Sequence, residues 1–170
     1  TNFLPSTGGS WLSLNPSVAS ITNSGQVTGQ SPGNARFIFT NSSTGCKSDT
    51  SGTITVLSRP EIQITGNTTI CVGATTTLNP TTGGVWTSNQ PTIASVTNSG
   101  IVTGLNPGMA TFVFTSSTSG CSSIASGQII VNPRPAISFS GPSSVCVGAT
   151  SQLSPSSGGT WTSTNPAVAS

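Results

Sequence analysis

The sequence predicts an all-β protein made of tandem two-sheet sandwiches. Three observations indicate this class. Closely similar stretches recur 75 residues apart, such as NSGQVTGQSPGNARFIFT at 23–40 and NSGIVTGLNPGMATFVFT at 98–115. Short alternating apolar runs are separated by Gly, Pro and Asn turn residues, which is typical of β-strands joined by tight turns. No window of the chain shows a sustained helical period.

The 75-residue interval also organises the chain. Three tryptophans follow it, and Cys46 matches Cys121 as Cys71 matches Cys146. Arg-Pro joints in LSRP and VNPRP divide the sequence into a first segment (1–58), a middle segment (59–133) and a third segment (134–170). We expect the middle segment to be a complete repeat, the other two to be partial, and the native protein to be longer. We also expect the repeats to lie end to end, each with its neighbours as partners.

Seven strands are expected in the middle segment, in chain order. EIQIT (61–65) alternates, ATTTL (74–78) is rich in Thr after a Val-Gly turn, and GGVWTS (83–88) follows a Gly-Gly turn. IASVT (93–97) and GIVTG (100–104) flank Asn-Ser-Gly, which is a hairpin signal. ATFVFT (110–115) and GQIIV (127–131) alternate again and complete two packed sheets with one buried face each.

The alternation predicts which side chains form the core. In the middle segment these are Trp86, Val102, Phe112, Phe114, Ile129 and Val131. The matching set of the first segment is Trp11, Val27, Phe37, Phe39, Ile54 and Val56, and Trp161 is the matching tryptophan of the third segment. Six glycines are expected to adopt turn conformations that a Cβ atom would penalise: Gly25, Gly29, Gly33, Gly100, Gly104 and Gly108.

The same motifs resemble a known family. Val72–Gly73, the W-x-S-x-x-P-x-x-A pattern at 86–94 and the G-x-V-T-G-x-x-x-G-x-A pattern at 100–110 are similar to the bacterial immunoglobulin-like group 2 (BIG2) domain. The cysteines and the charge-poor, Ser/Thr-rich strands resemble the tandem repeats of giant Bacteroidetes surface adhesins, of which the gliding-motility adhesin SprB is an example. The resemblance implies immunoglobulin-like sandwiches in a secreted cell-surface stalk or filament, exported by a type IX system.

Composition excludes several function classes. The chain holds two acids, Asp49 and Glu61, four Lys and Arg residues, and no His. General acid–base catalysis needs a titratable group poised near neutral pH, and calcium needs clustered carboxylates. We therefore expect no catalytic site, no metal and no cofactor. A net charge of +2 offers no footprint for nucleic acid, and no apolar run approaches membrane-spanning length.

An even number of cysteines at matched positions predicts disulfides in an oxidising, extracellular setting; free thiols or thiolate metal ligands are the alternative. Within the middle segment the candidate bridge is Cys71 with Cys121. An immunoglobulin topology opposes it, because the chain from Cys121 to Val131 spans ~30 Å when extended, whereas bridged Cα atoms lie within about 7 Å. A staggered bridge, which joins Cys71 to the counterpart of Cys121 one repeat further on, fits that topology better.

Three function classes remain open at this point. The repeats could be a structural stalk or spacer, a module that itself binds a glycan, ice or another cell surface, or a filament in which copies of the chain pair through sandwich edges. The tryptophans could stack on sugars, and Thr75–Thr77 could form a flat threonine face. The structural interpretations are favoured: the tryptophans are core side chains, and the threonines reflect ordinary β-propensity. Because matches between segments concentrate on turn glycines and apolar positions, the spacer is the leading hypothesis.

Overall fold

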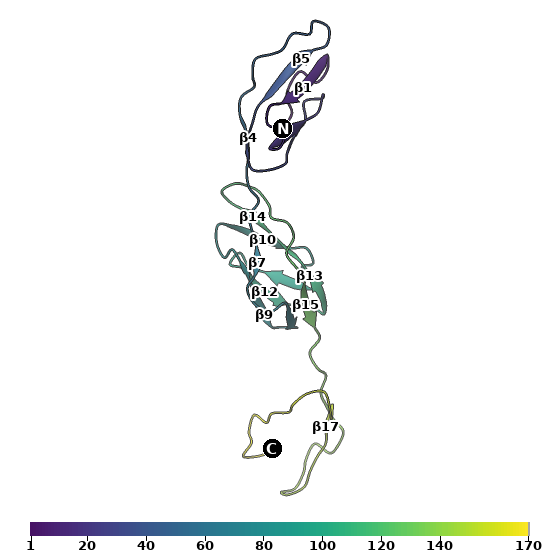
Figure 1. Cartoon of the computed structure of the whole chain (residues 1–170). Coiled ribbons are helices and arrows are strands. Elements are labelled where there is room, and N and C mark those ends of the chain that lie inside the picture. The colour runs from purple at the N-terminus through teal and green to yellow at the C-terminus, as the bar shows by residue number, and fades with distance from the viewer. Residues whose placement is uncertain (170) are drawn as a thin grey trace. The chain divides into compact units, whose positions relative to one another are not determined.

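The structure, a computed structural model, describes residues 1–169, so Ser170 at the end of the predicted third segment lies outside the described residues. All regular elements in this range are β-strands, which confirms the all-β class. No membrane-crossing helix is found in the described part of the chain. Two compact units are present, Thr1–Asn132 and Pro133–Ser170 (Figure 1). Their boundary lies one residue from the predicted joint at 133/134, and the division into three segments stays a prediction.

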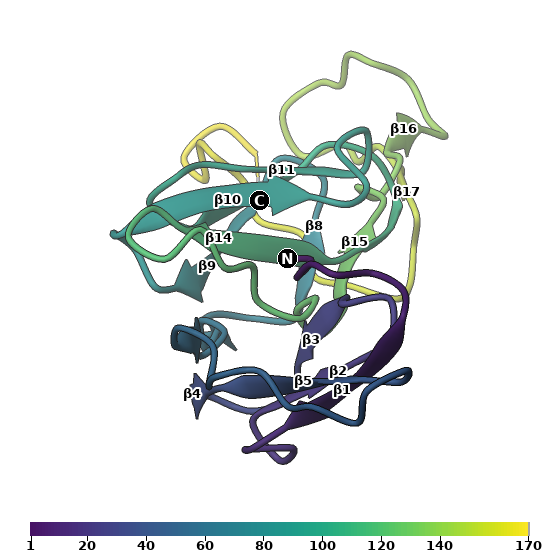
Figure 2. The ribbon, with the colours of Figure 1, turned by 90° about the horizontal axis from the view of Figure 1, so that it is seen from above.

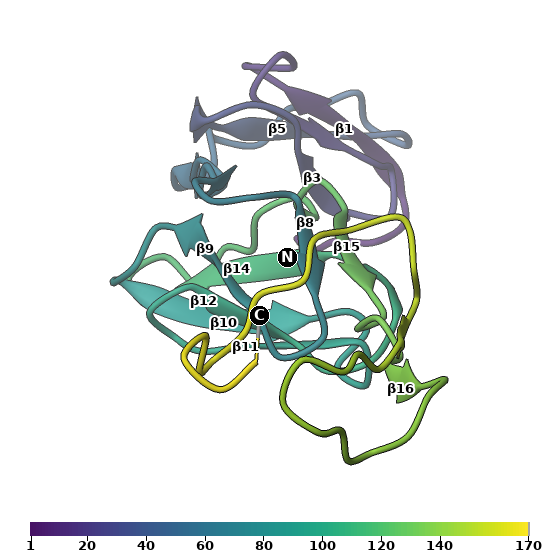
Figure 3. The same cartoon turned by 90° about the horizontal axis from the view of Figure 1, so that it is seen from below.

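The middle segment folds into three sheets around one core, in a sandwich-like arrangement. One sheet has the order β11-β12-β9-β7, a second has the order β13-β15-β8, and the third is the pair β10-β14. Figure 2 shows β10 beside β14, and Figure 3 shows β8 beside β15. The strands are β7 (Gln63–Ile64), β8 (Thr69–Cys71), β9 (Thr75–Asn79), β10 (Gly84–Ser88), β11 (Ala94–Val96), β12 (Ile101–Gly104), β13 (Gly108–Ala110), β14 (Phe112–Ser116) and β15 (Ile129–Asn132).

Two features of this sandwich differ from the prediction. Strand β8 was not expected; it pairs in parallel with β15, with Ile70 opposite Val131. The predicted strand at 110–115 is divided at Thr111 into β13, which pairs with β15, and β14, which pairs with β10. An alternating pattern indicates which side chains face the core, and these stay inward on both sides of Thr111, but it does not indicate the partner strand.

The predicted core of the middle segment is confirmed. Trp86, Val102, Phe112, Phe114, Ile129 and Val131 are all buried and belong to one cluster with Ile70, Leu78, Ala94 and Ala110. The rings of Trp86 and Phe114 are tilted against each other with their centroids 5.1 Å apart, a geometry that aromatic pairs prefer. Full burial of each large apolar side chain contributes ~1.5–3 kcal/mol, so this cluster is the main source of stability of the sandwich.

The first segment has a corresponding but more open core. Phe37 and Phe39 are buried as predicted, whereas Trp11, Val27, Ile54 and Val56 are only half-buried. The reason is that residues 1–58 include no counterparts of β7 and β8, which cover these positions in the middle segment. The strands are β1 (Gly9–Ser13), β2 (Ala19–Ile21), β3 (Val27–Gly29), β4 (Gly33–Ala35), β5 (Phe37–Asn41) and β6 (Ile54–Val56).

In the third segment the core prediction for Trp161 is wrong. This side chain is 48% exposed, against 4% for Trp86. Its unit forms only β16 (Ser138–Phe139) and β17 (Leu153–Ser154) within the described residues. Counterparts of β12 to β15, which bury Trp86 in the middle segment, are not among them, so the indole lacks its cover.

The six glycines serve two different purposes. Gly25, Gly33, Gly100 and Gly108 have positive φ angles, as predicted. A Cβ atom on Gly100 would in addition collide with the carbonyl oxygen of Leu78. Gly29 and Gly104 have no positive φ, so the prediction of a turn conformation is wrong for them. They are required for close packing, since a Cβ on Gly104 would lie 2.8 Å from Val131 Cγ1 and 3.1 Å from the Cys71 carbonyl oxygen.

Candidate functional site

Chemistry-bearing side chains are dispersed over the strands and loops. Within residues 1–169, no group of three or more His, Cys, Asp or Glu side chains is placed to hold a metal ion. Asp49 and Glu61 belong to different segments, and the matching positions are Ile124 and Ala136. The expected absence of a catalytic site, metal and cofactor stays a prediction.

The middle segment has a groove of about 450 Å³ between 59–63 and 124–127. Arg59 and Glu61 give it one charge of each sign, and Ile124 adds an apolar side chain that is 68% exposed. No His, Cys or Lys lines it. Exposed charges of this kind contribute about 0–1 kcal/mol to a contact.

The structure decides between the two interpretations of the middle tryptophan. Trp86 is buried, and its indole Nε1 donates a hydrogen bond to the Pro80 carbonyl oxygen at 2.8 Å. A sugar cannot reach this ring, so the core interpretation is confirmed for Trp86. Trp11 donates to the Pro5 carbonyl at 3.0 Å and packs on Phe3 and Phe39.

The predicted threonine strand does not present a continuous threonine face. Thr76 is buried, whereas Thr75 and Thr77 face solvent. The hydroxyl of Thr77 is engaged with that of Thr65 at 3.0 Å. Threonines that alternate between core and solvent are what an ordinary half-buried strand requires.

The four cysteines are free thiols, so the structure contradicts the predicted bridge between Cys71 and Cys121. Cys71 ends β8 opposite Asn132, the last residue of β15. Cys121 lies in the loop after β14, where its carbonyl oxygen accepts the Ser116 amide at 3.0 Å. From there the chain runs back along β14 to Ser126, which donates to Phe112, and only then enters β15. The two thiols are therefore at opposite ends of the sandwich.

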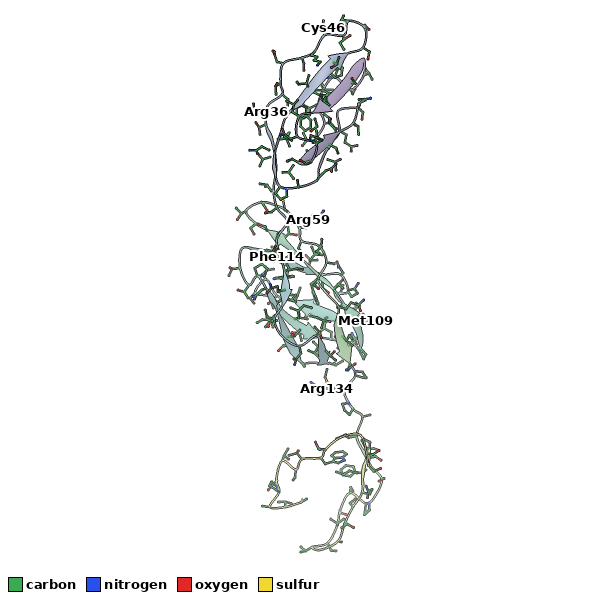
Figure 4. All side chains as sticks on the ribbon, in the orientation of Figure 1. Arg36, Cys46, Arg59, Met109, Phe114 and Arg134 are labelled. Carbon is green, nitrogen blue, oxygen red and sulfur yellow. The ribbon has the colours of Figure 1, made fainter. Side chains whose placement is uncertain are left out.

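Cys46 and Cys146 repeat these two environments. Cys46 follows β5, and its carbonyl oxygen accepts the Asn41 amide at 2.9 Å (Figure 4). Cys146 precedes a turn in which its carbonyl oxygen accepts the Ala149 amide at 2.9 Å, as that of Cys71 accepts the Ala74 amide. Two kinds of thiol position therefore exist, a loop thiol (Cys46, Cys121) and a turn thiol (Cys71, Cys146).

Comparisons with known proteins find only distant likeness. No protein-family model and no curated protein matches the chain. Among solved structures, domains 4 and 5 of the S-layer protein SbsC share 24% sequence identity at a TM-score of 0.30, with 78% of this chain and 74% of that chain covered. Domains 4–9 of the surface layer protein SbsC share 24% identity at a TM-score of 0.29, with 82% of this chain and 25% of that chain covered. The chain thus spans about a quarter of that second structure.

Proposed function

We propose that these residues form spacer repeats of a secreted bacterial cell-surface protein, related to the BIG2 domain. The observation that carries the proposal is the path of the chain through the middle segment. The chain enters at β7, where Gln63 lies opposite Asn79, and leaves after Asn132, which lies opposite Cys71. Since β9 runs from Thr75 beside the Cys71 turn to Asn79, entry and exit lie at opposite ends of the sandwich.

A sandwich traversed from end to end adds its own length to the chain. The entry end carries Arg59 and the exit end Met109 in Figure 4. The first segment uses the same internal register, with Trp11 opposite Phe39 as Trp86 is opposite Phe114. The groove residues Glu61 and Ile124 are replaced by Ala136 and Asp49 at the matching positions, whereas these buried pairs match. Selection for folding without selection for a repeated binding surface is what a spacer requires.

The positions of the thiols favour staggered bridges in an array of repeats. The turn thiol Cys71 lies at the exit end of its sandwich and the loop thiol Cys121 at the entry end, as the backbone hydrogen bonds above place them. A bridge from the turn thiol of one repeat to the loop thiol of the next would form across each joint, with an extracellular disulfide as the oxidant. Such bridges would persist in an extracellular location. Export by type IX secretion and a part in gliding motility follow from the family resemblance.

The test is deletion of residues 59–133 from the parent surface protein, with a matched variant in which an unrelated sandwich of similar length replaces them. A spacer predicts that deletion shortens the reach of the appendage in electron micrographs while adhesion persists, and that the replacement restores the reach. If both variants lose adhesion although the protein is still displayed, the repeats themselves bind the surface, and the spacer proposal fails.

A further inference from the structure

The middle segment joins a strand near its entry to its last strand in one parallel pair. β8 follows the entry strand β7, and β15 is the last strand before the exit. The two run side by side in the same direction, with Ile70 of β8 opposite Val131 of β15 (Figure 3). Both of these side chains are buried in the core, so the strands cannot part here without exposing it to water.

Backbone hydrogen bonds close both ends of this β8–β15 pair. At one end the Ile130 amide donates to the Thr68 carbonyl at 2.8 Å. At the other end the Val72 amide donates to the Asn132 carbonyl at 2.9 Å. The bonded length therefore extends one residue beyond β8 on each side.

Tension along the chain acts on this pair along its length. A pull on the entry side reaches β8 through β7 and acts toward the entry end, whereas a pull on the exit side acts on β15 toward the opposite end. Because β8 and β15 point the same way, the two pulls slide the strands past each other. The evenly spaced hydrogen bonds of a parallel pair are then strained together, so one cannot break until the others are also stretched.

The entry strand β7 has weaker contacts. It is two residues long, and the Thr65 amide that follows it donates to the Thr77 carbonyl of β9 at 2.9 Å. Ile62 and Ile64 are only partly buried against the core, in contrast to Ile70. We therefore expect β7 to detach first and the β8–β15 pair to determine when the sandwich unfolds.

We propose that the β8–β15 pair keeps the middle segment folded under tension along the chain. Forced unfolding is governed by the unfolding rate and not by equilibrium stability, so a pair that resists one pulling direction needs no unusual stability. The use of this resistance, to keep a surface spacer folded while it is pulled, rests on the proposed function. The pair itself does not, and a spacer whose β8–β15 pair is weak would still set the reach of an appendage.

Pulling the same sandwich in two directions tests the proposal. In one variant of the 170-residue chain, tethers are attached through Ser58→Cys and Pro135→Cys, and the four native cysteines are replaced by serine. In the second variant the tethers are attached to native Cys71 and Pro135→Cys, and the other three cysteines are replaced. Because Cys71 lies opposite Asn132, the second direction peels the pair open from one end.

Magnetic tweezers at constant force measure how long the middle segment stays folded in each variant. Its unfolding releases about 60 residues, or ~200 Å of extended chain, in either direction. We expect the folded state to last about 100-fold longer when the segment is pulled from residues 58 and 135 than when the pair is peeled from Cys71.

Two proline variants separate this role from ordinary stability. Ile130→Pro removes the amide that donates to Thr68 and leaves the core unchanged, since Ile130 faces outward. Thr69→Pro is the control, because Thr69 lies opposite Ile130, also faces outward, and directs its amide away from β15 in this register. Pulled from residues 58 and 135, Ile130→Pro should shorten the folded lifetime about 10-fold, and Thr69→Pro by less than about 3-fold.

Equal lifetimes in the two pulling directions would overturn the proposal, because a sandwich held only by its core does not distinguish them. Equal shortening by the two prolines would also overturn it, since any disturbance of these strands would then have the same effect. Thermal unfolding without force checks that each variant folds. If Ile130→Pro does not fold, the comparison of pulling directions still decides, because it uses strands without an added proline.

Discussion

The side-chain oxygen of Ser123 accepts a hydrogen bond from the backbone amide of Phe114 at 3.1 Å and donates to the Ile124 carbonyl at 2.7 Å. Ser126 does the same for the amide of Phe112 at 3.0 Å. The two hydroxyls thereby replace a neighbouring strand along β14. The first segment repeats the arrangement, with Ser48 on the Phe39 amide and Ser51 on the Phe37 amide. Some of the many serines in this chain therefore act as hydrogen-bond acceptors for backbone amides.

Substitution of Ser123 should reveal this role. Ser123 is buried, so Ser123→Ala leaves the Phe114 amide without a partner and should lower the free energy of unfolding by about 1–3 kcal/mol. Ser122→Ala is the control, since the hydroxyl of Ser122 meets Thr115 on the exposed side, and we expect a change within about 0.5 kcal/mol. Urea denaturation measures both variants. Equal effects of the two would show that the Ser123 hydroxyl does not satisfy the strand.

The two tryptophans of the middle and third segments should respond differently to truncation. Trp86→Ala removes a buried ring and leaves a cavity, which should cost roughly 3–5 kcal/mol. Trp161→Ala, at a half-exposed position, should cost less than about 1 kcal/mol in the 170-residue chain. Differential scanning calorimetry would show the lowered transition for Trp86→Ala. A similar loss for Trp161→Ala would mean that Trp161 is covered in solution.

The close approach at Gly104 predicts a steric penalty. Gly104→Ala forces a methyl group against Val131 and the Cys71 carbonyl, and overpacking of this kind costs about 1–3 kcal/mol. Gly127→Ala is a matched control in the same sandwich, because its nearest neighbour would be Ile64 Cδ1 at 3.5 Å. The difference between the two variants in thermal unfolding measures the packing contribution. A neutral Gly104→Ala would require β8 to shift freely away from β12.

The hydroxyl of Thr76 is the buried side-chain polar atom without a hydrogen-bond partner within residues 1–169. Thr76→Val keeps the shape and removes the desolvated hydroxyl, so we expect the free energy of unfolding to rise by about 1 kcal/mol. Thr75→Val, on the exposed face of β9, is the control and should change it by less than about 0.5 kcal/mol. A loss of stability in Thr76→Val would indicate that the hydroxyl has a partner in solution, such as a buried water.

Burial was predicted correctly where the alternation within one strand indicates which side chains face the core. Phe112 and Phe114 alternate with Thr111 and Val113, and this pattern is enough to predict their burial. The alternating pattern could not predict features that depend on contacts with a strand far away in the sequence. The β8 strand is three residues long and becomes recognisable only beside β15, and the packing role of Gly104 depends on Val131, which is far away in sequence. Serine hydroxyls that act in place of a strand have no periodic signal at all.

The candidate site shows the same limit. Matched cysteines predicted pairing of Cys71 with Cys121, although the expected immunoglobulin topology opposed it, and the structure places the two thiols at opposite ends of the sandwich. The carbonyl oxygen of the loop thiol Cys121 accepts a hydrogen bond from the Ser116 amide, and that of the turn thiol Cys71 accepts one from the Ala74 amide, which the sequence does not reveal. Burial of Trp161 was predicted from its match to Trp86, but its unit forms only β16 and β17 within the described residues, and the side chain is half-exposed. The local sequence pattern therefore predicted the fold class, whereas contacts between distant strands determine where the thiols lie and which tryptophans are buried.

Thiol chemistry provides the last prediction, because the two positions in the middle segment differ in exposure as well as location. Cys71 is exposed and Cys121 is partly buried, with its thiol directed at the Ser119 carbonyl at 3.8 Å. In the folded, reduced protein, iodoacetamide should therefore modify Cys71 before Cys121. A disulfide needs Cα atoms within about 7 Å, so mild oxidation of a monomeric preparation should yield no Cys71–Cys121 bridge. Peptide mapping by mass spectrometry without reduction reads out both results, and unfolding in urea before oxidation is the control that lets these cysteines meet. A Cys71–Cys121 bridge formed quickly in the folded monomer would contradict the placement of these thiols at opposite ends and would remove the structural basis for staggered bridges between repeats.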